Sequence, residues 1–324
     1  MPGQTFTVSH ESTLLPYLLE ILSGQSRTGV KNMLSKGQVQ VNGSSCTAFD
    51  QPLKKGDRLE ILPKGISIAR ATRNDARDAV LRTGVKILFE DENYIVVDKP
   101  SGMLTVSSAR GSAAKNGHRE TTLYAILNAY VKTNARMQRK EDLLEGREPD
   151  RSTAKVWIVH RLDKGTSGVL VFAKNERAKD LLQSKWKDLV AERRYAAWLE
   201  GAVENERGAV QSWLVENPKS LKMNSFPEEL KDGQLAITHY RVLERSRYHT
   251  LVEFELETGR KNQIRVHAAD LGHPVAGDEK YGAQTNPIHR LALHATTLVF
   301  RNPFGGKMVR CSSPLPASFE RFRR

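Results

Sequence analysis

The sequence predicts a protein that combines α-helices with β-strands, in a small N-terminal unit and a larger second domain. Three observations predict this arrangement. Leucines recur at helical spacing near the N-terminus, an Asn-Gly pair soon after them marks a tight hairpin turn, and a later segment alternates apolar with charged residues as a half-buried strand does. The chain of 324 residues is long enough for two separate cores.

The small unit is predicted over residues 1–62. Helical spacing runs from Leu14 to Leu22, and a second helix is expected to begin at Ser26, a residue type that caps helix N-termini well. The Asn42-Gly43 pair that follows is a strong hairpin signal, because both residues accept positive φ angles. A linker without a sustained apolar period is expected over residues 63–84.

The large domain is predicted over residues 85–324. Apolar runs at residues 156–159 and 169–172 predict buried strands, whereas residues 252–256 alternate apolar side chains with glutamates and predict a strand with one solvated face. A short helix is predicted from Leu123 to Tyr130. Residues 132–155 are dense in charges of both signs and are predicted to be a surface insertion.

Composition bears on partners and location. Lys and Arg number 50 against 37 Asp and Glu, and the net charge of +13 favours a polyanionic partner such as a nucleic acid. A basic surface with no such partner is the alternative that charge leaves open. Cys46 and Cys311 offer no disulfide framework, and no window approaches the ~20 apolar residues of a membrane-spanning helix. We expect a soluble, cytoplasmic protein with no membrane partner.

The segment from Val159 to Val169 holds the residues best suited to chemistry. His160, Arg161 and Asp163 lie between two apolar stretches, on a turn rich in small residues. A carboxylate at a strand end, beside glycines that permit close approach, suits a pocket that admits a substrate. The pattern alone leaves two interpretations open: Asp163 is catalytic, or it pairs with a basic neighbour in a charged turn.

This segment resembles the signature of the RluA-type family of RNA pseudouridine synthases, which reads HRLD, then a basic residue and a TSG-like tail. The residues that match are His160, Arg161, Leu162, Asp163, Thr166, Ser167 and Gly168. Gly165 departs from the pattern, since the family often has Asp there. This departure concerns the geometry of the turn more than its chemistry.

Two further stretches resemble motifs of the same family. Residues 256–267 are similar to its TGR-x-HQIR-x-H stretch, with Lys261 and Asn262 in place of the usual Thr and His. Residues 194–197 are similar to its K-x-Y-x-A strand. Smaller matches extend the resemblance from about residue 85 to residue 305, in the order that the family has them.

The resemblance implies roles for the site residues. Asp163 is the catalytic carboxylate, Arg265 is the cation that keeps it ionised and oriented, and Tyr195 stacks on the uracil and helps to move its C5 proton. The residues expected to bind the substrate are His160, Arg161, Leu162, Arg260 and Gln263. Because the target base has to leave its stack, Arg161 is also the candidate for filling the vacated space.

The reaction that the resemblance implies is an isomerisation. The bond from C1′ of the ribose to N1 of uracil breaks, the base turns, and C1′ is joined to C5. No atom is lost, so no metal, redox cofactor or second substrate is expected. The sequence leaves open whether Asp163 attacks the sugar or the base, or removes a sugar proton.

The N-terminal unit resembles an S4 RNA-binding domain, through Ser26-Arg27, Lys36-Gly37, Val41-Asn42-Gly43 and Gly56-Asp57. The residues expected to face RNA phosphates there are Arg27, Lys31 and Lys36. A charged helix face that is merely solvated is the alternative.

The two resemblances together imply an α+β fold: an S4 module, a linker, and a catalytic domain built on a mixed, mainly antiparallel β-sheet flanked by helices. The expected partner is structured RNA, with ribosomal RNA of the large subunit favoured and transfer RNA as an alternative. A non-catalytic RNA-binding or ribosome-assembly factor on the same fold is a further alternative. We expect a monomer.

Patterns of other functional classes are incomplete in this chain. His267 and His273 are six residues apart with no cysteine near them, which does not fit a zinc site. Ser167 lacks the G-x-S-x-G context of a hydrolase. A glycosidase needs two paired carboxylates, whereas Asp163 alone has a strong case here.

Overall fold

The computed structural model describes residues 4–35, 38–61, 76–107, 121–149 and 153–323. The chain separates into two compact units. Residues 1–80 and 129–154 form the N-terminal unit, and residues 81–128 and 155–324 form the large unit. None of the helices in the described ranges is both long and apolar enough to cross a membrane.

In the described part of residues 4–61, two helices, a four-stranded antiparallel sheet and a two-stranded sheet surround one apolar core. Helices α1 (Leu14–Ile21) and α2 (Arg27–Ser35) confirm the predicted positions, and the hydroxyl of Ser26 accepts a hydrogen bond from Gly29 N at 3.1 Å, as an N-cap does. The strands in the described part of this unit are β1 (Gln4–Thr7), β2 (Ser12–Thr13), β3 (Val39–Val41), β4 (Ser44–Ser45), β5 (Pro52–Leu53) and β6 (Arg58–Ile61).

The predicted hairpin is present in this sheet. Strands β3 and β4 pair antiparallel, and Asn42 and Gly43 between them have φ angles of 52° and 81°. Both lie in the left-handed region that Asn and Gly adopt most readily. Gly37, one of the residues that resemble an S4 domain, lies outside the described residues, as does most of the predicted linker 63–84.

Helix α4 (Leu123–Leu144) is longer than the short helix predicted over residues 123–130. The charged residues 132–144, predicted as part of a surface insertion, continue the helix, because Lys, Arg, Glu and Gln all have high helix propensity. Gln138 supports this stretch by donating a hydrogen bond to Asp142, one turn further on, at 3.1 Å.

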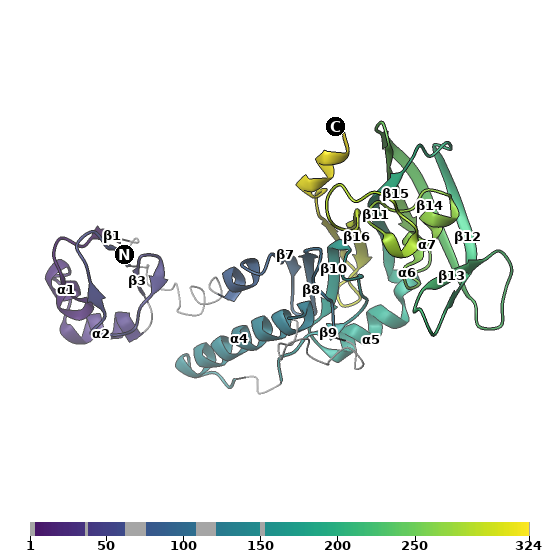
Figure 1. Ribbon diagram of the computed structural model, residues 1–324. Helices are drawn as coiled ribbons and strands as arrows, with labels where there is room; N and C mark the ends of the chain where they lie inside the picture. Colours follow the sequence, from purple (N-terminus) through teal and green to yellow (C-terminus); the bar gives the residue numbers. More distant parts are fainter. Residues whose placement is uncertain (1–3, 36–37, 62–75, 108–120, 150–152, 324) are drawn as a thin grey trace. The chain divides into compact units, whose positions relative to one another are not determined.

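The large unit is organised around one broad sheet (Figure 1). Among the described residues the sheet has eleven strands in the order β13-β12-β14-β15-β11-β16-β10-β8-β7, with β17 on β16 and β9 on β10. Its neighbouring strands pair antiparallel except β10 and β16, which run parallel. The strands are β7 (Lys86–Glu90), β8 (Tyr94–Lys99), β9 (Trp157–Ile158), β10 (Ser167–Ala173), β11 (Val190–Glu200), β12 (Arg207–Glu216), β13 (Met223–Phe226), β14 (Gln234–Arg245), β15 (His249–Leu256), β16 (Leu293–Arg301) and β17 (Met308–Ser312).

Helices flank this sheet, which confirms the predicted α+β class. Helix α5 (Glu176–Ser184) packs on β9 and β10, and α7 (Gln263–Asp270) packs on β13 and β14. The short helix α6 (Trp186–Leu189) follows α5, and two 3-10 helices, η2 (Glu279–Tyr281) and η3 (Ala317–Arg323), complete the described helices of the unit. Strand β15 buries Val252 and Phe254 while its glutamates stay partly exposed, as its alternation predicts.

Strand β10 lies inside the sheet between β16 and β8, and all seven of its residues are buried. Its start is shaped by a close approach to β16. Gly168 has a φ angle of 111°, and a Cβ atom there would lie 2.1 Å from the carbonyl oxygen of Ala295. Only glycine fits at this position, so the point where the preceding loop joins β10 is fixed against β16.

Candidate active site

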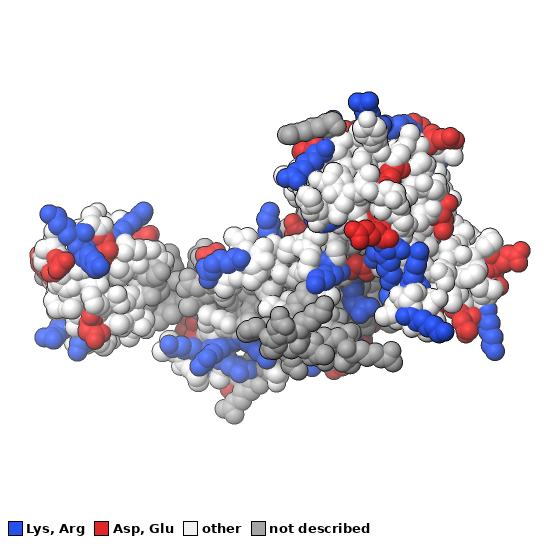
Figure 2. All heavy atoms as spheres, in the orientation of Figure 1, with Lys and Arg blue, Asp and Glu red and all other residues white. Residues whose placement is uncertain are grey.

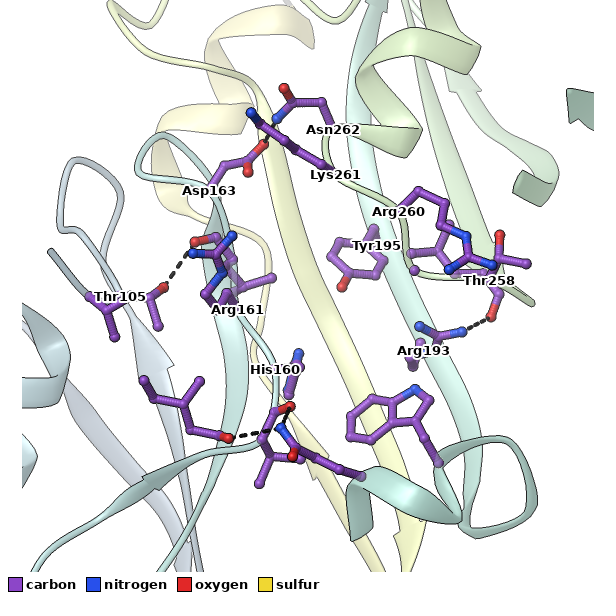
Figure 3. A pocket seen from close by; sticks show the side chains of 18 of the residues that line it. Thr105, His160, Arg161, Asp163, Arg193, Tyr195, Thr258, Arg260, Lys261 and Asn262 are labelled. Carbon is purple, nitrogen blue, oxygen red and sulfur yellow. Dashed lines mark hydrogen bonds between the residues drawn. The ribbon is translucent and has the colours of Figure 1, made fainter. Parts of the chain in front are cut away.

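A pocket of about 1040 Å³ opens in the large unit where five segments meet. The residues that line it belong to 104–106, 158–164, 183–188, the start of β11, and 256–262. Figure 3 shows Asp163 at one end of the pocket, Tyr195 next along it and Arg193 further on. Part of each of the three main segments that matched the family motifs therefore faces one cavity.

Asp163 has one oxygen that is held and one that is open. Its Oδ2 accepts hydrogen bonds from Asn262 Nδ2 at 2.5 Å and from Arg265 Nη1 at 3.2 Å. No described residue donates a hydrogen bond to Oδ1, and the side chain is 33% exposed. The carboxylate is thus oriented by the protein through Oδ2 while Oδ1 stays available to a ligand in the pocket.

The loop that carries Asp163 is fixed through its backbone carbonyl groups. Thr105 Oγ1 donates to Leu162 O at 2.9 Å, and Ser101 Oγ donates to Gly165 O at 2.7 Å. The ammonium of Lys99, which is fully buried, donates to Lys164 O at 3.3 Å and to two further carbonyl groups. Burial, reinforced by the charge of Arg290, lowers the pKa of Lys99 to about 8, and the charge of Asp163 partly opposes this.

Arg265, on α7, is shared by two carboxylates. It donates from Nε and Nη2 to the two oxygens of Asp278, both at 2.6 Å, in a bidentate pair, and from Nη1 to Asp163. Asp278 is almost completely buried, with 1% of its side chain exposed. Burial disfavours the charged form of Arg265, but Asp278 and Asp163 more than offset it, so the pKa of Arg265 lies above its ordinary value. The guanidinium is therefore permanently charged and fixed in orientation beside Asp163.

Asn262 is the second donor to Asp163 and stands where the family pattern usually has His. It precedes α7 with a φ angle of 55°, a left-handed conformation that Asn adopts at little cost. The hydroxyl of Tyr281 donates to Asn262 Oδ1 at 3.3 Å, which turns the amide nitrogen towards Asp163. The ring of Tyr281 also lies 5.0 Å from the guanidinium of Arg265. One tyrosine thus contacts both groups that hold the carboxylate.

Tyr195 and His160 line the pocket as uncharged rings. Burial raises the pKa of Tyr195 above its ordinary value, with Arg193 opposing and Asp163 adding to the shift, so its hydroxyl stays protonated. Burial, together with the charge of Arg193, lowers the pKa of His160 to about 3. Its Nε2 accepts a hydrogen bond from Val171 N at 3.3 Å, so this ring helps to hold the loop against β10.

The remaining residues predicted to bind the substrate fall into two groups. Arg161, Leu162 and Arg260 line the pocket, and both arginines are exposed. Gln263 does not belong to the lining. It is buried, and its amide is used within the protein: it donates to Ile237 O and Thr238 Oγ1 and accepts from Thr258 Oγ1 and Arg260 N. Gln263 therefore fixes the turn before α7 and does not face the cavity.

Of the three basic residues predicted to face RNA in the N-terminal unit, the structure describes Arg27 and Lys31. Arg27 and Lys31 are exposed and four residues apart on α2, so they share one face of that helix. Lys36 lies outside the described residues.

The sequence did not single out Asp278, Tyr281, Arg193 or Trp186 as site residues, and it left the role of Asn262 open. For Arg193 a signal was present. It lies two residues before Tyr195 on a strand, so the two side chains leave the same face of the sheet. The contacts of Asp278 and Tyr281 depend on how the segment after α7 folds back, which no local pattern indicates.

Known proteins resemble this chain along most of its length. Residues 93–270, more than half of the chain, match the family described as RNA pseudouridylate synthase. An RNA pseudouridine synthase of Synechocystis sp. is 34% identical over 310 residues, covering 94% of this chain and 86% of that protein. Ribosomal large subunit pseudouridine synthase D of Haemophilus ducreyi is 30% identical over 335 residues, covering 97% and 92%. A solved human structure, RNA pseudouridylate synthase domain containing 4, has a similar fold, with a TM-score of 0.55 and 24% identity over 78% of this chain and 97% of that one.

Proposed function

We propose a catalytic group and a substrate for this protein on the premise that the chain belongs to the family of RNA pseudouridylate synthases. The family match covers more than half of the chain, and relatives at 30% identity or more extend over nearly all of it. The protein is therefore an isomerase that forms pseudouridine in RNA.

Asp163 is the group that we assign to the breaking of the glycosidic bond. The observation that supports this most directly is the asymmetry of its carboxylate: Oδ2 is held by Asn262 and Arg265, and Oδ1 is open to the pocket. In the reaction, C1′ of the ribose leaves N1 and joins C5 of the same uracil. N1 gains a proton and C5 loses one, so the reaction is balanced without any other reactant.

Arg265 and Asn262 keep Asp163 ionised when a base fills the pocket. A bound base excludes water, and the loss of water favours the neutral form of a carboxyl group. The fixed guanidinium opposes this through its charge, and the amide opposes it through a hydrogen bond to the charged form. We assign to Tyr195 the stacking of the uracil, because its ring lies in the pocket beside Asp163 (Figure 3).

Ribosomal RNA of the large subunit is the substrate that we propose. Several relatives at 30% identity or more, such as the proteins of Haemophilus ducreyi and Nitrosomonas europaea, are named ribosomal large subunit pseudouridine synthase D. The net charge of +13 favours a large polyanion, and on the face seen in Figure 2 many Lys and Arg side chains gather on the large unit. Transfer RNA is the second candidate.

Residues 1–62, which belong to the N-terminal unit, are proposed to be an S4-like RNA-binding module. Its support is the sequence resemblance, together with the exposure of Arg27 and Lys31 on one face of α2. Such a module would hold structured RNA through its phosphates while the large unit acts on a base. We further propose that the protein is cytoplasmic, since Cys46 and Cys311 are free thiols, as is usual in a reducing compartment. We also propose that it is a monomer, as expected from the sequence.

Tritium release tests the proposed function against a non-catalytic role in RNA binding. Unmodified transcripts of large-subunit ribosomal RNA and of transfer RNA, each labelled with tritium at uracil C5, are incubated with the purified protein. We expect tritium release from the ribosomal transcript, because C5 exchanges its proton for a carbon bond. Release from the transfer RNA alone would replace the proposed substrate, and binding without release from either would contradict catalysis.

A further inference from the structure

The pocket extends beyond the place where Asp163 and Tyr195 would hold one nucleotide. Its volume of about 1040 Å³ is at the upper end of the about 300–1,000 Å³ typical of sites for drug-sized ligands. The end away from Asp163 is lined by His160, Trp186, Lys187 and Arg193. Figure 3 shows His160 and Arg193 there, with Arg161 between His160 and Asp163, and Tyr195 between Arg193 and Asp163.

Arg193 is a half-buried cation without a carboxylate partner. Its Nη2 donates to two backbone carbonyl groups, Leu256 O and Glu257 O, both at 2.9 Å. No carboxylate in the described ranges lies within ion-pair distance of it, and burial lowers its pKa below the ordinary value. A buried charge that lacks a counter-charge is costly, and a guanidinium pairs best with planar or tetrahedral oxyanions such as phosphate. The arrangement is therefore suited to an anion that arrives with the ligand.

Trp186 provides an aromatic surface next to this cation. It lines the pocket and is half-buried against the apolar cluster around β10. The centroids of the Trp186 and His160 rings are 5.0 Å apart, and the guanidinium of Arg193 lies 5.7 Å from the indole. The low pKa of His160 keeps its ring neutral. Nucleobases stack on such aromatic surfaces irrespective of their sequence.

The charges along the whole pocket favour a chain of phosphates over a single one. Six basic residues line the pocket, against three acidic ones, Asp163, Asp188 and Glu257. The basic residues are Arg161, Lys164, Lys187, Arg193, Arg260 and Lys261. At the Trp186 end Lys187 and Arg193 lie with Asp188 and Glu257, so the excess of positive charge belongs to the pocket as a whole.

We propose that the Trp186 end is a subsite for the nucleotide next to the target uridine, whose base stacks on Trp186 while Arg193 binds the phosphate that joins the two nucleotides. The proposal rests on the proposed function, since it takes the ligand to be RNA. Arg193 and Tyr195 point from the same face of β11, so a uracil at Tyr195 brings that phosphate within reach of Arg193. The substrate is then an RNA in which two adjacent nucleotides leave the stack, as at loops and bulges.

Equilibrium binding of a short, fluorescein-labelled single-stranded oligouridylate tests the aromatic part. Trp186→Leu keeps an apolar side chain against the core but offers no ring, and we expect it to weaken binding roughly 5- to 150-fold, the equivalent of one stacked base. Trp186→Phe keeps a ring and should retain most of the affinity. Trp157→Leu is the matched control: Trp157 packs on the same cluster and does not line the pocket. Equal affinities of the Leu and Phe variants at 186 would overturn the subsite.

The salt dependence of the same binding tests the cationic part. Each phosphate contact to a single strand contributes roughly 0.7 to the slope of log K against log salt concentration. Arg193→Gln should reduce the slope by about this amount, whereas Arg194→Gln should not. Arg194 is the matched control because it is adjacent on β11, points to the other face and is paired with Glu192 and Glu255. An unchanged slope for Arg193→Gln would contradict the phosphate contact.

A failure of the subsite can be distinguished from a failure of the proposed function. If both variants bind as the wild type does while the wild type releases tritium from ribosomal RNA, the subsite is wrong and the proposed function stands. If the wild type releases no tritium, the proposed function fails, and the two binding experiments still decide whether this end of the pocket holds a nucleotide.

Discussion

Asp163 and Asp278 bind the same guanidinium in opposite ways. Asp278 gives both oxygens to Arg265, each at 2.6 Å, and is 1% exposed. Asp163 gives one oxygen, at 3.2 Å, and is 33% exposed. Both oxygens of Asp278 are used by Arg265, whereas Oδ1 of Asp163 remains available to a ligand.

The difference shows how one cation can serve both folding and chemistry. A guanidinium bound by a single carboxylate could turn with it, but the bidentate contact to Asp278 fixes the plane of Arg265 and hence the direction of Nη1. The charge beside Asp163 is thereby placed before any substrate arrives. In this view Asp278 is a positioning residue, and Asp163 is the group to which we assign the reaction.

The largest expected effect is on turnover. Asp163→Asn keeps the shape of the side chain and removes its charge, so tritium release should fall at least roughly 10²–10⁴-fold, the contribution of a positioned acid or base. The thermal unfolding temperature should stay close to that of the wild type, because the side chain is partly exposed. Wild-type turnover in this variant would contradict the role assigned to Asp163.

The second effect concerns stability, for which we expect Asp278 to matter more than Asp163. Asp278→Ala leaves Nε and Nη2 of Arg265 buried without partners, and the free energy of unfolding of the large unit should fall by about 3–5 kcal/mol. Asp163→Ala should cost no more than about 1 kcal/mol, since it removes one contact from a partly exposed pair. Urea unfolding of both variants measures the contrast, and equal losses would show that the two carboxylates are equivalent to the fold.

Substitutions of Asn262 separate two effects: the hydrogen bond that orients Asp163, and the left-handed backbone at residue 262. Asn262→Gly removes the amide and retains the left-handed conformation, so turnover should drop roughly 10- to 150-fold, as for a lost hydrogen bond to a charged group, with little change in stability. Asn262→Ala should lose as much turnover and, in addition, about 1–2 kcal/mol of stability through backbone strain. Asn262→His restores a donor and should recover part of the activity. A fully active Gly variant would exclude a positioning role.

The smallest expected effect is on the pH dependence of stability, through the buried ring of His160. His160 is held neutral, with its pKa lowered from 6.5 to about 3 by burial. The unfolded chain takes up a proton at this residue below about pH 6.5 while the folded chain does not, so stability is lost as the pH falls towards 3. Between pH 7.5 and pH 5 the loss at this residue should be roughly 1–2 kcal/mol. His160→Gln should show a correspondingly shallower pH dependence in urea unfolding, and an identical one would mean that His160 titrates normally.

Local patterns predicted the elements of the fold well where a single physical signal dominates. The alternation at residues 252–256 and the Asn42-Gly43 turn are two such cases, because side-chain period and positive φ angles are properties of the segment itself. The length of α4 was missed, because its second half is stabilised by helix propensity and side-chain pairs and carries no apolar signal that would distinguish it from a surface loop.

The site was predictable as far as the motifs reach. They placed Asp163 and Arg265 in one site although 102 residues separate them, and the structure brings the two side chains into contact. Gln263 belongs to the same motif, yet it faces inward, since neighbours on a helix start point in different directions. Asn262 stands at a position of the family motif, but its contact with Asp163 forms only through the tertiary path of the chain before α7. The contact of Asp278 with Arg265 depends in the same way on the turn after α7, so the sequence did not indicate either role.

Gly168 does not line the pocket, yet its close contact with β16 gives this position a large expected influence on the reaction. Any side chain there would act as a wedge between β10 and β16 and push the following strand away from Ala295. The loop before β10 would move with the strand, and Asp163 would lose its contact with Arg265, whose position is fixed by Asp278. In a library of random variants we expect residue 168 to tolerate no replacement, although it lies outside the pocket lining.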